Sequence, residues 1–100
     1  MTDRKEIEKL IEQELKEANE KYPLFHSPHE AYAVLKEECD ELYDDYNTID
    51  DKLDDMWTRI RYDANTADKV GKIYNFAINA ACEAIQIAAV CKKIKQSGID

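Results

Sequence analysis

A stretch near the C-terminus constrains the fold most, because between Ile73 and Val90 the chain is apolar on almost every side of a helix. The surrounding sequence predicts a helix from about residue 67 to residue 96, with Gly98 as its stop. A helix that is apolar all round must be covered by other protein. A chain of 100 residues has too few other helices to surround it. We therefore expect an all-α fold, a helical bundle completed by oligomerisation.

The rest of the sequence predicts about three more helices. Apolar residues at helical spacing indicate a first helix over about residues 3–20, which ends before Pro23. Ser27, followed by proline and then by glutamate at the third helical position, predicts the start of a second helix that runs to about residue 47. A weaker cap at residues 48–51 predicts a break there and a short third helix. The bundle should thus contain about four helices.

Composition limits the partners that the protein can have. Its formal net charge is −8, and no basic patch offsets it, so binding to a nucleic acid polymer or an anionic membrane is not expected. Such a chain needs a divalent cation to handle phosphates. The three cysteines are odd in number and lack metal-ligand spacing, so they should be reduced. No apolar run should reach the length needed to cross a bilayer, and we expect a single domain over residues 1–100 in the cytoplasm.

Two groups of polar residues are candidates for a site. Five acidic residues fall on one arc of the second helix, which either faces solvent or faces something positive: Glu37, Glu38, Glu41, Asp44 and Asp45. Four polar residues lie within about 80° on the apolar last helix: Asn75, Asn79, Glu83 and Gln86. A network of hydrogen bonds between helices would satisfy the second group. A buried Glu83 would also need a cation or a proton, so Mg²⁺ shared with the glutamates of the second helix is favoured.

These residues carry a family resemblance. The run from Glu37 to Leu42 resembles the E-E-x-x-E-L signature of the MazG-like, all-α nucleotide pyrophosphohydrolases, and Glu83 to Gln86 takes the place of their second motif, E-x-x-D. The similarity covers roughly residues 27–92 and extends to short MazG-like proteins of phages and prophages. It implies a homodimeric or homotetrameric bundle in which carboxylates hold Mg²⁺, the ion holds a nucleoside triphosphate, and water cleaves the bond between the α and β phosphates.

The resemblance also implies roles for single residues. The metal ligands are then Glu37, Glu38, Glu41 and Glu83, with Glu38 and Glu41 as catalytic residues, and Gln86, Asn79 and Lys72 are candidate substrate contacts. Gln86 stands where the family has aspartate, and the two motifs lie farther apart than is usual, so Asp51 or Asp54 could supply a missing carboxylate. Two alternatives stay open: a non-catalytic protein that sequesters nucleotides in a phage context, and a plain helical interaction module.

Overall fold

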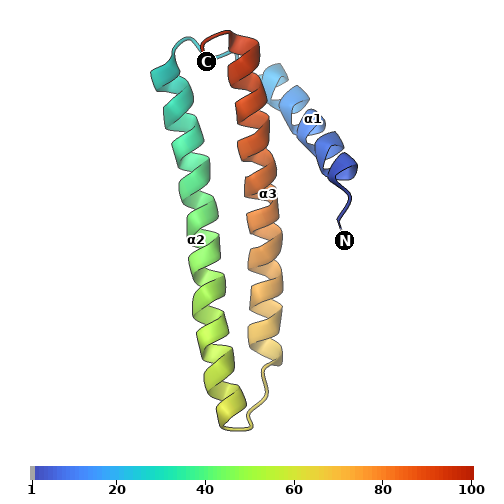
Figure 1. Cartoon of the computed structure of the whole chain (residues 1–100), viewed down its shortest axis with the longest axis vertical. Helices are drawn as coiled ribbons and strands as arrows, with labels where there is room; N and C mark the ends of the chain where they lie inside the picture. Colours follow the sequence, from blue (N-terminus) through green and yellow to red (C-terminus); the bar gives the residue numbers. More distant parts are fainter. Residues whose placement is uncertain (1) are drawn as a thin grey trace.

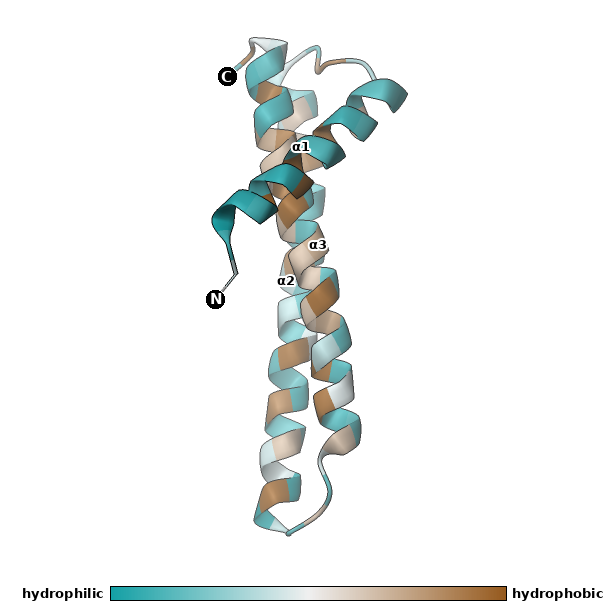
Figure 2. Ribbon diagram, turned by 90° about the vertical axis from the view of Figure 1, so that its right-hand side faces the viewer, coloured by the Kyte–Doolittle hydropathy of each residue, from teal (hydrophilic) through white to brown (hydrophobic). Residues whose placement is uncertain are grey.

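The computed structural model describes residues 2–100, and within them it contains three helices and no strand (Figure 1). These are α1 (Arg4–Lys21), α2 (Pro28–Arg61) and α3 (Ala67–Ser97). Helices α2 and α3 lie side by side as a long antiparallel hairpin, and α1 crosses α3 near the C-terminal end of that helix (Figures 1 and 2). Within residues 2–100, α1 packs against α3 but not against α2. The predicted all-α class is confirmed.

The predicted break in the second helix is wrong, because α2 continues without interruption through residues 48–51. Thr48 does not cap a new helix. Its hydroxyl donates a hydrogen bond of 3.1 Å to the backbone carbonyl of Asp44, one turn earlier in the same helix. No glycine or proline follows to stop the helix before residue 61. The described chain therefore has three helices rather than about four.

The predicted start of the second helix and the predicted end of the last helix are confirmed by their capping contacts. Ser27 is extended, with φ −153°, and its hydroxyl oxygen accepts a hydrogen bond of 3.2 Å from the backbone N–H of Glu30. The side chain of Glu30 in turn accepts a hydrogen bond of 3.1 Å from the backbone N–H of His26. Gly98 ends α3 with φ 68°, a left-handed conformation that glycine adopts without steric cost. These caps fix where the hairpin begins and ends.

Packing is concentrated at the end of the hairpin where α1 lies. The buried apolar residues all belong to α1, to the connection that follows it, or to the adjoining ends of α2 and α3: Leu15, Phe25, Ala31 and Ala89. Within residues 2–100, no large side chain is fully buried. The radius of gyration is 17.4 Å, whereas a compact domain of this length has one of about 13 Å. One chain by itself thus has a small core and an extended shape.

The other end of the hairpin leaves its large apolar side chains in solvent. Eight of them are 46 to 66% exposed: Tyr43, Tyr46, Leu53, Trp57 and Ile60 on α2, and Val70, Tyr74 and Ile78 on α3. Hydrophobic segments continue along both helices to the tip (Figure 2). The positions of α2 that are half buried against α3 include the charged residues Asp45 and Lys52. Much of the apolar surface therefore points away from the contact between the two helices.

Helix α3 is long and apolar enough, by length and composition alone, to cross a membrane. Its most apolar 18-residue window has a mean hydropathy of 1.3, and 6% of that window is buried within the chain. The sequence prediction that no segment reaches this threshold is wrong. Core helices of water-soluble proteins have the same length and composition, so this finding alone does not identify what covers α3.

Candidate functional site

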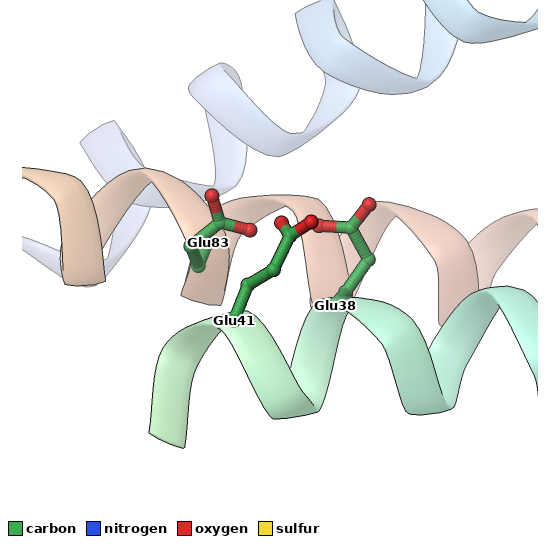
Figure 3. Close-up of side chains that lie close together, drawn as sticks. All are labelled: Glu38, Glu41 and Glu83. Atoms are coloured by element: carbon green, nitrogen blue, oxygen red, sulfur yellow. The ribbon is translucent and has the colours of Figure 1, made fainter. Parts of the chain in front are cut away.

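Three carboxylates converge where the middle of α2 faces α3 (Figure 3). Glu38 and Glu41 lie three residues apart on α2 and therefore project from the same side of that helix. Glu83 reaches toward them from α3. One oxygen atom from each of the three carboxylates lies within 4.8 Å of the other two. The structure thus brings together glutamates from both sequence motifs.

Gln86 joins this cluster from the next turn of α3. With its amide nitrogen turned toward the carboxylates, Gln86 donates hydrogen bonds to Glu38 Oε2 at 2.7 Å and to Glu83 Oε2 at 3.1 Å. The amide therefore connects a glutamate of α2 to a glutamate of α3. We call Glu38, Glu41, Glu83 and Gln86 the carboxylate cluster from here on.

The surroundings of the carboxylate cluster favour protonation of two of its members. Burial raises the pKa of Glu83 above its usual value, and hydrogen bonding with Glu38 raises it further. Hydrogen bonding with Glu83 and repulsion between the two negative charges raise the pKa of Glu41. Each of these effects makes the negative form of the carboxyl group less favourable in the absence of a cation. A cation placed between the carboxylates would remove that penalty.

The donor set fits a hard divalent cation. Carboxylate oxygens are the ligands that Mg²⁺ and Ca²⁺ prefer in proteins. Two oxygens on opposite sides of one Mg²⁺ ion lie about 4.2 Å apart, and for Ca²⁺ the same separation is about 5 Å. Three oxygens within 4.8 Å of one another are close enough for one such ion to contact all of them after rotation of the side chains. Glu38, Glu41 and Glu83 are the residues that can hold the ion.

The other predicted metal and substrate residues lie at different distances from the carboxylate cluster. Glu37 lines a groove beside it, together with Glu38 and Gln86. Asn79 borders a shallow hollow of about 300 Å³ that Glu41 and Glu83 also line. These two positions are adjacent to the cluster.

The remaining candidates are too far along their helices to contribute to the cluster. Lys72 is exposed on α3 eleven residues before Glu83, which is about 16 Å along the helix axis. Asp51 and Asp54 are exposed on α2, about 15 Å or more beyond Glu41. The structure therefore brings none of these three residues to the carboxylate cluster.

A groove of about 530 Å³ adjoins the cluster, and the sequence did not predict it. Its walls come from α1 and α2, which diverge from each other, and its floor includes Ala89 and Val90 of α3. Its far end is lined by Tyr22, Phe25 and Lys93. A charged residue seven positions after Gln86, on a helix that is otherwise apolar there, was the signal available in the sequence.

Comparison of the chain with protein-family models, with curated proteins and with solved structures finds no match.

Proposed function

We propose that the protein is a Mg²⁺-dependent, MazG-like pyrophosphohydrolase that converts nucleoside triphosphates to monophosphates and pyrophosphate. The observation that supports this best is the convergence of Glu38 and Glu41 of α2 with Glu83 of α3. Carboxylates that gather from two helices repel one another, and a shared cation would offset that repulsion. A cation bound between the three carboxylates would stabilise this arrangement.

In this proposal each carboxylate has a chemical task. Bound Mg²⁺ would neutralise phosphate charge and lower the pKa of a coordinated water. Glu38 and Glu83 would hold the ion from opposite helices. Glu41 would accept the proton of the attacking water. A net charge of −8 would repel a free triphosphate, so the metal is needed for binding as well as for hydrolysis.

We further propose that the active form is a cytoplasmic homodimer or homotetramer. Support comes from the exposed apolar residues of the hairpin, among them Trp57 at 58% and Tyr74 at 66% exposure. A second copy would cover them with a matching apolar surface. A lipid cover fits less well, because Asp50, Asp51 and Asp54 lie on the helix directly beside α3 and would be costly in hydrocarbon.

Pyrophosphate release tests the proposed activity. The wild-type protein is incubated with a panel of nucleoside triphosphates and cyclic nucleotides, in Mg²⁺ and in EDTA, and both binding and release of pyrophosphate are measured. We expect release from triphosphates in Mg²⁺ and none in EDTA. Glu38→Gln should lower the rate at least about a hundredfold, because it removes a negative ligand from the cluster. Glu20→Gln makes the same change at an exposed position of α1 and should keep the wild-type rate.

A second function, nucleotide sequestration without catalysis, is favoured by one observation. The Gln86 amide donates hydrogen bonds to Glu38 and Glu83 and so holds these carboxylates together without a metal. A protein of this kind could capture nucleotides in a phage context and release them unchanged. In the same experiment, tight binding with recovery of intact ligand would identify sequestration. No binding of any nucleotide would leave a helical interaction module as the better description.

A further inference from the structure

The groove beside the carboxylate cluster has two chemically different ends. Glu38 and Gln86 belong both to the cluster and to the lining of the groove, so one end of the groove lies at the cluster. Lys93 lines the opposite end. It follows Gln86 by seven residues, which is two helical turns, so both side chains project from the same side of α3 about 10 Å apart along the axis. The groove therefore leads from a candidate metal site to the ammonium group of Lys93.

Lys93 differs from its neighbours in being buried without a charged partner. It is 6% exposed, and within residues 2–100 its ammonium group makes no ion pair and no hydrogen bond. The exposed lysines nearby are paired, Lys92 with Glu12 and Lys95 with Asp100. The ammonium nitrogen itself keeps access to water, since within residues 2–100 no buried side-chain nitrogen lacks a hydrogen-bond partner. The hydrogen-bond donors of Lys93 are thus free to meet an acceptor that enters the groove.

Two aromatic rings lie beside this ammonium group. Lys93 Nζ is 5.1 Å from the centre of the Phe25 ring and 5.9 Å from the centre of the Tyr22 ring. Both distances are within the range of cation–π contacts, which offset part of the cost of burial. Phe25 is buried, whereas Tyr22 is 65% exposed and leaves a ring face open to a ligand. A flat ring with an acceptor atom at its edge matches these two features together.

We propose that this end of the groove binds the nucleobase of the substrate, with Lys93 donating to a keto oxygen of the base and Tyr22 stacking on its ring. The proposal rests on the proposed function, since it takes the phosphates to lie at the carboxylate cluster. A volume of about 530 Å³ is within the range of small-molecule sites. Lysine has donors and no acceptor, so the bases with a keto oxygen, which are uracil, thymine, guanine and cytosine, should be preferred over adenine, which has none.

Binding measurements with matched ligands test the role of Lys93. The dissociation constants of α,β-methylene analogues of UTP, GTP and ATP, and of inorganic tripolyphosphate, are measured by calorimetry in Mg²⁺. For Lys93→Met we expect binding of the UTP and GTP analogues to weaken by about ten- to a hundredfold, with tripolyphosphate unchanged. Lys92→Met removes the same charge at the next residue, outside the groove, and should bind every ligand as the wild type does.

A second variant keeps the test informative if Lys93→Met does not fold. Tyr22→Leu removes an exposed ring and should weaken the nucleotide analogues by about tenfold, again without an effect on tripolyphosphate. Unchanged binding of the UTP analogue in a folded Lys93→Met variant would overturn the inference and leave the metal site intact. Equal weakening of tripolyphosphate would also overturn it, because Lys93 would then contact phosphate. A wild-type protein that binds neither tripolyphosphate nor nucleotides would overturn the proposed function first.

Discussion

At the scale of single residues, keeping all members of the carboxylate cluster negatively charged costs free energy, and either a proton or a cation would lower that cost. Glu83 is raised in pKa mainly by burial, and Glu41 mainly by its hydrogen bond with Glu83. Both groups therefore respond to the same ligand. Without a cation, protonation of one of these carboxyl groups relieves the repulsion within the cluster. The stability of the metal-free protein should then depend on pH in a direction that the shifts determine.

Metal-free protein should lose stability as pH rises from the ordinary glutamate pKa of 4.5 through the raised pKa of Glu83. In that window the folded state holds more protons than the unfolded state, so the free energy of unfolding falls with increasing pH. Denaturant unfolding in EDTA, from pH 4.5 to about 7, measures how steeply the free energy of unfolding falls with pH. Glu83→Gln should make this dependence weaker. Glu20→Gln changes a glutamate outside the cluster and should leave the dependence unchanged. A Glu83→Gln variant with the wild-type slope would contradict the assignment.

At the scale of helices, the two long elements begin in different ways, and this difference can be measured. Ser27 caps α2 with a side-chain hydrogen bond, whereas Thr66 precedes α3 without one. We expect Ser27→Ala to lower the free energy of unfolding by about 1 kcal/mol, because one backbone N–H of Glu30 loses its acceptor. Thr66→Ala should change it by a few tenths of a kcal/mol at most. Urea unfolding of both variants compares them, and equal losses would show that the cap of α2 is not formed in solution.

The helix ends also show which parts of this fold could be predicted from sequence. Ser27 with Pro28 and the glycine at 98 were correct signals, because each satisfies backbone groups in one specific way. Thr48 was misleading, since its hydroxyl can cap a new helix or bond backward within the old one, and only the tertiary structure shows which. Helical spacing predicted that Glu83 could meet the glutamates of α2. The position of Lys93 beside Tyr22 and Phe25 was not predicted, because it depends on where the connection after α1 folds.

At the scale of the whole molecule, a single chain is an open three-helix arrangement that measures 56 by 28 by 20 Å. Its buried residues occupy one end, and the apolar side chains at the other end have no partner within residues 2–100. A hairpin of two helices alone buries too little surface to be stable in water. The carboxylate cluster lies between these two regions. The geometry of the cluster therefore depends on the contacts that keep the distal part of α2 against α3. A second copy of the chain that packs on this part would stabilise the proposed site as well as the fold.

Placing a charge on the exposed apolar side of α2 should dissociate the assembly. We expect the wild-type protein to sediment as a dimer or tetramer, and Trp57→Glu to raise its dissociation constant at least tenfold, because a buried tryptophan is a common energetic centre of interfaces. Sedimentation velocity over a concentration series measures both. Thr58→Glu adds the same charge at the next residue, on another side of α2, and should leave the assembly intact.

If the wild type is a stably folded monomer at micromolar concentration, a second copy does not cover the exposed apolar side of the hairpin. If Trp57→Glu also loses pyrophosphate release while Thr58→Glu keeps it, assembly of the hairpin and geometry of the carboxylate cluster are coupled.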